Sequence, residues 1–275
     1  MESSIEGGAA GLSTSVSSLP SFTSPPVVEV AVGVEFLQLP GLGAVQLVAL
    51  HNLWREEFPE LREQVALPPS SPVDGPQGFQ FQFVDGPPAL RLWMLKQDED
   101  ELLQVQNDRL FLNWRRAAGD NREYPRYDHL RDTYQRVFSD FQKRIAASDA
   151  GALRPHTAAV TYVNRFPLAP GDQLKDAIAP LNDSWNLIAG AAPEVRIIAP
   201  VISGIGADQL TGRLIAFASA DETESGYGYL QIDARISLAE PGIDIFSCLD
   251  LAHETCVTSF EKLTTRKMHE RWGKQ

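Results

Sequence analysis

Strands are predicted where apolar and polar residues alternate along the chain. In PPVVEVAVGVEF (residues 25–36), apolar residues at 28, 30, 32, 34 and 36 alternate with Glu29, Ala31, Gly33 and Glu35. A period of two over this length is typical of a half-buried β-strand. FQFQFV (79–84) also alternates strictly, and ALRLWMLKQ (89–97) is predicted to form the next strand.

The stretch ELLQVQNDRLFLNWRR (101–116) predicts a β-hairpin. A two-residue turn at Asn107 and Asp108 pairs Gln106 with Arg109, because Asn and Asp tolerate a positive φ. This register turns one face inward, made of Leu103, Val105, Leu110, Leu112 and Trp114. The opposite face carries Leu102, Gln104, Gln106, Arg109, Phe111, Asn113 and Arg115. A sheet covered by helices on one side exposes its other face, so we expect this polar face to be solvated or to dock a partner.

Two helices are predicted in this first half from apolar residues at helical spacing. The segment 40–61 carries a stripe of Leu42, Val45, Ala49 and Leu53, with Leu50 and Trp54 beside it. The segment 123–145 is a longer helix. Its expected core-facing residues are Leu130, Tyr134, Val137, Phe138, Phe141 and Ile145.

The second half repeats the order of the first. Strands are predicted at 156–166, 194–203, 212–220 and 228–238, with a helix at 171–188 that is kinked or broken near Pro180. The segment 244–272 is predicted as one long closing helix. Its inward residues would be Ile245, Leu249, Ala252, Cys256, Phe260 and Leu263.

The predicted fold class is therefore α+β, with two tandem units of strand, helix, antiparallel strands and long helix, and with the helices on one face of antiparallel sheets. We expect a disordered tail at 1–25, rich in Ser and Gly, and a first unit at 26–147. A linker at 148–155 would lead to the second unit at 156–275.

Composition narrows the classes of function. The chain has 275 residues and a formal net charge of −12, which disfavours non-specific attraction to nucleic acid or anionic lipid. No apolar run reaches the length of about 18 residues that a membrane helix requires, and the start of the chain does not resemble a secretory signal. Cys248 and Cys256 lie about 12 Å apart on one helix, too far for a disulfide. Two unpaired cysteines suit a reducing cytosol, so a cytoplasmic location is predicted.

Motifs for catalysis or cofactor binding are incomplete. HETC at 253–256 lacks the second histidine of a zinc-protease motif, so His253 is interpreted as an exposed helix residue. GLGAVQL lacks the third glycine of a dinucleotide-binding turn, and the chain has no G-x-S-x-G elbow. The acidic run 98–101 is interpreted as a solvated turn. No cofactor, metal site or catalytic residue is predicted.

One basic cluster, NWRRAAGDNREYPRYDHLR (113–131), combines arginines with Trp114, Tyr124 and Tyr127. Arginine and aromatic residues together are typical of protein interfaces and of platforms for single-stranded nucleic acid. Neighbouring acids can also neutralise the arginines locally, and nucleic acid or an anionic ligand is the less favoured partner. The candidate partner-binding residues are Gln104, Gln106, Arg109, Phe111, Asn113, Arg115, Arg122, Tyr124, Arg126 and Tyr127.

Several stretches resemble a sporadically distributed family of bacterial proteins that has no established activity. They are PPVVEVAVGVEF, LRLWMLKQDEDELLQVQNDRLFLNWRR, EYPRYDHLRDTYQRVFSDF and the closing helix with Phe260 and Trp272. The resemblance spans most of the chain after the tail and implies no catalytic residue. The order of elements in each half also resembles the duplicated helix-grip arrangement of TATA-box-binding-protein-like folds, in topology alone.

Three functional hypotheses follow. The first is a non-enzymatic cytosolic binding or regulatory protein, such as an accessory or antitoxin-like partner of a neighbouring gene product, with a protein partner on the polar hairpin face and the Arg–Tyr loop. The second is a small-ligand-binding protein or enzyme with a cavity between sheet and long helix. The third is a chaperone with an exposed apolar sheet. A homo-oligomer is compatible with each of them.

Overall fold

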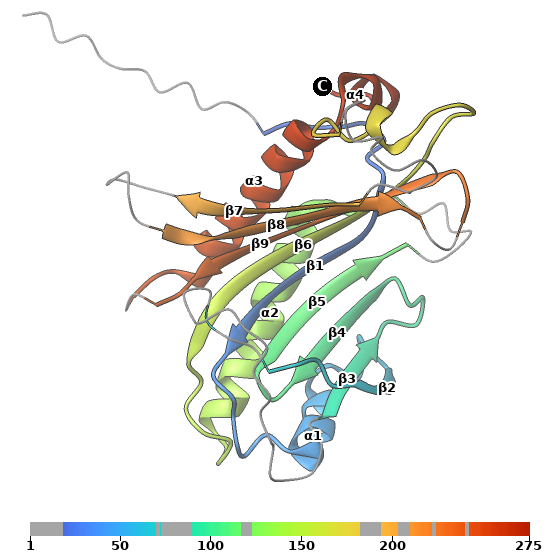
Figure 1. Ribbon diagram of the computed structural model, residues 1–275. Coiled ribbons are helices and arrows are strands. Elements are labelled where there is room, and N and C mark those ends of the chain that lie inside the picture. Colours follow the sequence, from blue (N-terminus) through green and yellow to red (C-terminus); the bar gives the residue numbers. More distant parts are fainter. Residues whose placement is uncertain are drawn as a thin grey trace, which may run out of the picture.

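A single antiparallel sheet forms the centre of the molecule. The computed structural model describes residues 19–69, 72, 90–116, 123–181, 194–202, 210–221, 224–239 and 242–275. Nine strands lie in the order β2-β3-β4-β5-β1-β6-β9-β8-β7 (Figure 1). Their bounds are β1 Val27–Phe36, β2 Glu60–Val65, β3 Leu90–Leu95, β4 Glu101–Gln106, β5 Arg109–Arg115, β6 Pro155–Pro167, β7 Val195–Ile202, β8 Leu210–Ala220 and β9 Tyr227–Ser237. Because β1 pairs with β6, the strands of both halves of the chain form one continuous sheet.

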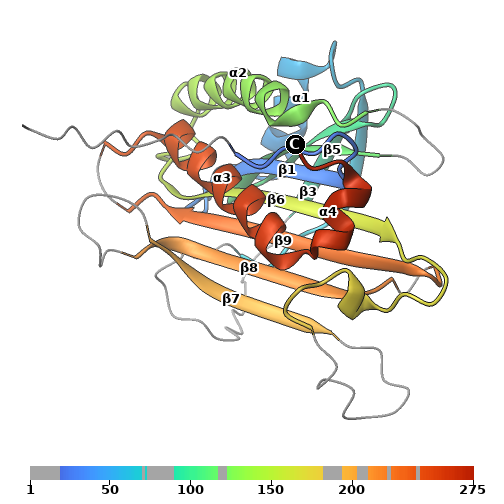
Figure 2. The ribbon, with the colours of Figure 1, turned by 90° about the horizontal axis from the view of Figure 1, so that it is seen from above.

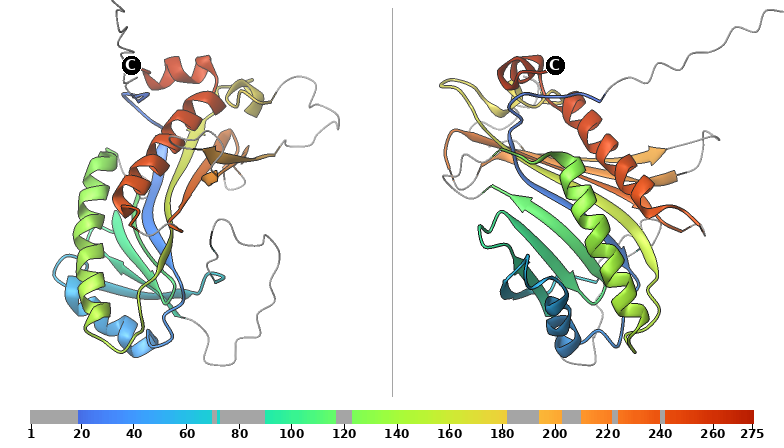
Figure 3. Two further views of the ribbon diagram at one scale, coloured as in Figure 1. Left: turned by 90° about the vertical axis from the view of Figure 1, so that its left-hand side faces the viewer. Right: turned by 180° about the vertical axis from the view of Figure 1, so that it is seen from behind.

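Two long helices, α2 (Arg126–Ala146) and α3 (Ile245–Leu263), lie side by side on one face of this sheet (Figures 2 and 3). The short α1 (Ala44–Trp54) packs against α2 and β3. The helix α4 (Arg266–Trp272) ends the chain beside the described N-terminal residues. The α+β class and the placement of the long helices on one face are confirmed.

The core lies between the sheet and the long helices. Val30, Val32 and Val34 of the central strand β1 are fully buried, as their alternation predicts. All six expected core-facing residues of α2 are buried, and the hydroxyl of Tyr134 donates to the carbonyl oxygen of Leu110 at 3.0 Å. This bond satisfies a phenol that would otherwise lack a partner in the core.

The predicted hairpin register is confirmed. Gln106 pairs with Arg109 and Glu101 with Trp114, so the apolar face points toward the helices and Trp114 is buried. The turn differs in its backbone, because among the described non-glycine residues only Glu99 and Arg126 have a positive φ. The carbonyls of Asn107 and Asp108 instead accept hydrogen bonds from the chain that leaves β1.

The first half differs from the prediction in two elements. The buried face of α1 consists of Leu47, Leu50, His51 and Trp54, whereas Val45 and Leu53 are exposed. The helix has two apolar stripes. The stripe that contacts α2 and β3 contains Leu47, Leu50 and Trp54, and the predicted stripe with Val45 and Leu53 faces outward. The strand β2 was not predicted, because ELREQV is polar and almost wholly exposed at the edge of the sheet.

In the described residues of the second half, the two predicted long helices are shorter or interrupted. The closing helix breaks at Thr264, which takes an extended conformation with ψ 152°. The break is held by hydrogen bonds from Thr265 N–H to the Ala177 carbonyl and from Ala179 N–H to the Leu263 carbonyl. In the described part of the expected helix at 171–188, a single short turn forms at Leu174–Asp176. The residues after this turn bond to the backbone at the break between α3 and α4.

The first described residues bond to the last residues of the chain. Thr23 and Ser24 donate backbone hydrogen bonds to the carbonyls of Gly273 and Trp272, and Phe22 is buried. Residues 22–24, within the predicted tail at 1–25, therefore contact the end of the chain. The predicted strand at 79–84 lies outside the described residues.

Candidate functional site

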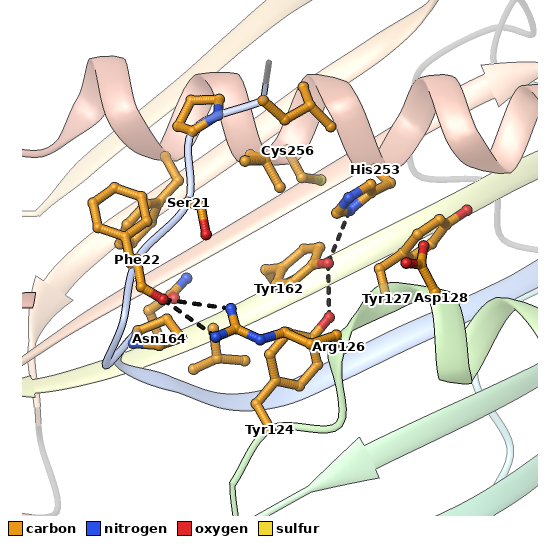
Figure 4. A pocket seen from close by; sticks show the side chains of 16 residues that line it. Ser21, Phe22, Tyr124, Arg126, Tyr127, Asp128, Tyr162, Asn164, His253 and Cys256 are labelled. Atoms are coloured by element: carbon orange, nitrogen blue, oxygen red, sulfur yellow. Dashed lines mark hydrogen bonds between the residues drawn. The ribbon is translucent and has the colours of Figure 1, made fainter. Parts of the chain in front are cut away.

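A cavity of about 320 Å³ lies between the start of α2, the middle of α3 and the central strands. We call it the α2–α3 pocket (Figure 4). Its walls come from four parts of the chain: the N-terminal segment 19–27, the residues at and before the start of α2, β6 and α3. The residues that line it are Leu19, Pro20, Ser21, Phe22, Pro25, Val27, Tyr124, Arg126, Tyr127, Asp128, Tyr162, Asn164, His253, Cys256, Val257 and Phe260.

Three polar side chains form a hydrogen-bonded chain in the wall of this pocket, which we call the Tyr–His chain. The hydroxyl oxygens of Tyr124 and Tyr162 are 3.0 Å apart, and the Tyr162 oxygen lies 2.9 Å from Nδ1 of His253 (Figure 4). Tyr162 is in the middle and is buried, whereas Tyr124 and His253 are half-buried. The donor in each bond depends on the tautomer of His253.

The imidazole of His253 is held in place by an aromatic stack. Its ring lies parallel to that of Tyr127, with centroids 3.9 Å apart and an interplanar angle of 4°. The Tyr127 hydroxyl donates to Oδ1 of Asp250 at 2.9 Å, and Arg131 binds the same carboxylate with two nitrogens at 2.6 and 3.0 Å. Since Asp250 belongs to α3 and both of its partners to α2, these contacts fix the two helices on either side of the pocket.

Burial keeps the titratable groups of the inner wall neutral. Desolvation lowers the pKa of His253 from 6.5 to about 4, because a charged imidazolium would lose water contacts there. The same cause raises the pKa of the Tyr124 and Tyr162 phenols and that of the Cys256 thiol. The Cys256 thiol donates to the Val160 carbonyl at 3.3 Å. The inner wall thus carries hydrogen-bonding groups without charge at neutral pH.

The N-terminal segment closes one side of the pocket through Phe22. The ring of Phe22 packs edge-on against Phe260, with centroids 5.3 Å apart, and also contacts His269 and Trp272. Burial lowers the pKa of His269 as well. Phe22 and Phe260 thus give the cavity an apolar wall.

Two exposed charges of opposite sign, Arg126 and Asp128, lie at the rim. The guanidinium of Arg126 points toward the carbonyl oxygen of Phe22 at 3.4 Å (Figure 4). The backbone of Arg126 has φ 72°, a conformation that costs a non-glycine residue about 1–3 kcal/mol. This strained residue is the first of α2 and lies directly beside the cavity.

The structure separates the predicted site residues into two groups. Tyr124, Arg126 and Tyr127 meet at the α2–α3 pocket. The hairpin residues lie on the opposite face of the sheet, and Arg122 is outside the described residues. The hairpin group consists of Gln104, Gln106, Arg109, Phe111, Asn113 and Arg115.

The expectation that the polar hairpin face is solvated is wrong for Gln106, Arg109 and Asn113, which are buried. The chain after β2 crosses this face: the Gln106 amide bonds the backbone of Leu67 at 2.9 and 3.0 Å, and Arg109 donates to the Pro68 carbonyl at 2.6 Å. The side chains of Gln104, Phe111 and Arg115 stay half-buried. Whether this face binds a partner stays a prediction.

Arg109 belongs to a buried ionic cluster. Its guanidinium bonds the Asp108 carboxylate at 2.9 and 3.2 Å and lies 3.7 Å from Glu35, which also pairs with Arg235. Burial raises the pKa of Glu35 against the attraction of the two arginines. His156, in the same region, has its pKa lowered by burial and by Arg235. The cluster joins strands β1, β5 and β9.

Two arginines of the basic cluster pair with acids distant in sequence, Arg115 with Glu99 at 3.2 Å and Arg131 with Asp250 of α3. Arg131 also lies 4.0 Å from its sequence neighbour Asp132, one of the local acids expected to neutralise the cluster. The acidic turn is also less solvated than expected, because Glu101 is buried and pairs with Lys96 at 2.8 Å.

His253, Tyr162 and Phe22 were missed as site residues. His253 is not an exposed helix residue: it is half-buried, stacked and hydrogen-bonded. The three residues come from segments far apart in the sequence, and no spacing rule links them. Among the described residues, no three metal-ligating side chains lie together, and no helix is long and apolar enough to cross a membrane. Comparison of the chain with protein-family models, curated proteins and solved structures finds no match.

Proposed function

We propose that this protein is a non-enzymatic binding protein that holds a small neutral ligand in the α2–α3 pocket. The observation that carries the proposal is a cavity of about 320 Å³ whose wall combines apolar rings with convergent hydrogen-bonding groups. Ligand pockets typically have volumes of about 300–1,000 Å³ and this kind of lining. The size suits a ligand of about two fused rings.

The shifted pKa values favour binding over catalysis. A general base acts best with a pKa near 7, and a nucleophilic thiol needs a lowered pKa. In this pocket the pKa of His253 is lowered and that of the Cys256 thiol is raised. Both groups are therefore neutral hydrogen-bonding partners rather than an activated base and nucleophile.

Naphthalene, a neutral two-ring probe, tests the proposal by equilibrium dialysis with fluorescence detection. Val257→Trp places an indole in the wall of the pocket, and Val48→Trp places the same group on the exposed surface of α1 as a control. We expect saturable binding to the unmodified chain and to Val48→Trp, and at least tenfold weaker binding to Val257→Trp. Equal affinity for all three chains, or no binding at all, would contradict the proposal.

The hypothesis of a protein partner is less favoured than ligand binding in the pocket. Its predicted surface is the hairpin face together with the Arg–Tyr loop. Coverage by residues 67 and 68 leaves only Gln104, Phe111 and Arg115 of the candidate hairpin residues partly reachable. The chaperone hypothesis likewise stays untested.

We further propose that the two halves are duplicated units and that the protein is cytoplasmic. In each half the first strand pairs with the last, β1 with β5 and β6 with β9, and a long helix follows, which supports a duplication. Two buried, unpaired cysteines support a reducing compartment. Membership in the uncharacterised bacterial family named above stays part of this proposal.

A further inference from the structure

The Tyr–His chain has two interchangeable hydrogen-bonding patterns. In one, Tyr124 donates to Tyr162 and Tyr162 donates to Nδ1 of His253, so Nε2 carries the proton. In the other, Nδ1 donates to Tyr162 and Tyr162 donates to Tyr124, whose own proton becomes free. Both patterns satisfy the observed distances of 3.0 and 2.9 Å. Each end of the chain therefore serves as a donor in one pattern and as an acceptor in the other.

The two ends of the chain are available to a ligand. Among the described residues, the Tyr124 hydroxyl has no partner other than Tyr162, and Nε2 of His253 has no hydrogen-bond partner. Both residues line the α2–α3 pocket. A ligand that covers these ends and offers no hydrogen-bonding group would leave them desolvated and unpaired, which is unfavourable.

The remaining walls select the shape and the charge of the ligand. Phe22, Phe260 and the stacked pair of Tyr127 and His253 present flat or edge-on aromatic surfaces. A full charge would lose its hydration against neutral groups. The rim charges of Arg126 and Asp128 are opposite in sign, so they give no net attraction to an anion or a cation.

We propose, resting on the function proposed above, that the ligand is a neutral aromatic molecule bearing a hydroxyl group that binds an end of the Tyr–His chain. A hydroxyl both donates and accepts, so it matches the chain in either pattern. The aromatic part of the ligand fills the space between Phe22, Phe260 and Tyr127. A carboxylate or ammonium analogue of the same shape gains no such advantage.

A matched series of probes tests this inference by equilibrium dialysis with the full chain. The probes are 2-naphthol, naphthalene and 2-naphthoate, which share a ring system and differ in the polar group. We expect 2-naphthol to bind about five- to tenfold more tightly than naphthalene, the effect of one net hydrogen bond. We expect 2-naphthoate to bind no more tightly than naphthalene.

Two sets of variants show whether the Tyr–His chain is responsible. The double variant Tyr124→Phe/His253→Phe removes both ends that would bind the ligand and keeps an aromatic ring at each position. It should abolish the preference for 2-naphthol over naphthalene while naphthalene still binds. Tyr127→Phe is the matched control: it keeps the stacked ring and removes a hydroxyl that bonds Asp250 outside the chain. It should keep the preference.

The outcomes separate this inference from the proposed function. If naphthalene binds but 2-naphthol binds no more tightly, or if the preference persists in Tyr124→Phe/His253→Phe, the inference is wrong and the pocket stands. Tightest binding of 2-naphthoate would also overturn the inference, because the Arg126 charge would then dominate recognition. If no probe binds, the proposed function itself fails.

Discussion

Acidification from pH 7 to pH 5 should destabilise the native protein through His253. This imidazole is half-buried against Tyr127 and Tyr162, and desolvation lowers its pKa from 6.5 to about 4. In the unfolded chain the same side chain takes up a proton below about pH 6.5. Between these two pH values the unfolded state binds more protons than the native state, so stability falls as the pH falls.

The magnitude follows from the two pKa values. With a native pKa of about 4 and an unfolded pKa of 6.5, the difference in proton uptake lowers the free energy of unfolding by about 2 kcal/mol at pH 5. Partial exposure of the ring makes this an upper figure. The loss is negligible above about pH 7 and levels off below about pH 4.

Urea denaturation followed by tryptophan fluorescence at pH 7, 6 and 5 measures the effect. The His253→Gln variant should lack this part of the pH dependence, so its stability should fall by about 2 kcal/mol less than that of the unmodified chain. Tyr162→Phe keeps the imidazole buried and should retain the dependence, because burial is the main cause of the shift. Parallel pH profiles for the unmodified chain and His253→Gln would refute the reasoning.

Three further substitutions test packing, each by urea denaturation at pH 7. Arg109→Ala should cost about 3 kcal/mol, because it removes one of the cations that pair with the buried carboxylates of Glu35 and Asp108, whereas Arg196→Ala at an exposed site of β7 should stay within about 0.5 kcal/mol. Equal effects of these two arginine substitutions would mean that the buried ionic cluster does not form. Trp114→Ala should cost about 3–5 kcal/mol, and a near-neutral result would place this ring outside the core. Gly33→Ala should cost about 1–3 kcal/mol, because its Cβ would lie 2.4 Å from a neighbouring aromatic ring, whereas Gly43→Ala, with 3.4 Å of clearance, should be tolerated.

The sequence predicts strands well where one face must be buried. The alternation of side chains along the two strands that flank Asn107 and Asp108 correctly places Leu103, Leu112 and Trp114 toward the helices. A shift of the register by one residue would bury the polar side chains of the hairpin instead. Helix α2 is predicted to within a few residues for the same reason.

Elements fixed by distant contacts are not predictable from local pattern. α1 has two apolar stripes, and only contact with α2 and β3 selects Leu47 and Trp54 over Val45. The break at Thr264 depends on backbone bonds from a segment more than 80 residues earlier in the chain, at Ala177. Arg109 is buried because the residues after β2 cross the sheet over its side chain. β2 is an edge strand with a polar sequence, so the local pattern does not predict this crossing.

The sequence predicts only some residues of the candidate site. The abundance of Arg and Tyr before α2 indicated Tyr124, Arg126 and Tyr127, and these residues do line the pocket. Tyr162 and His253 complete the hydrogen-bonded chain from β6 and α3, and each is unremarkable in its own segment. The packing of α3 against β6 brings them within 3 Å of each other.

The most direct test of a neutral Tyr–His chain that binds a hydroxyl is nitrogen NMR of the His253 imidazole in the full chain. The protein is labelled with ¹⁵N-histidine, and His253→Gln identifies the signals. At pH 6 we predict a neutral imidazole whose nitrogen signals shift when 2-naphthol is added and shift less with naphthalene. A protonated imidazolium at pH 6, or signals that saturating 2-naphthol leaves unchanged, would contradict the account.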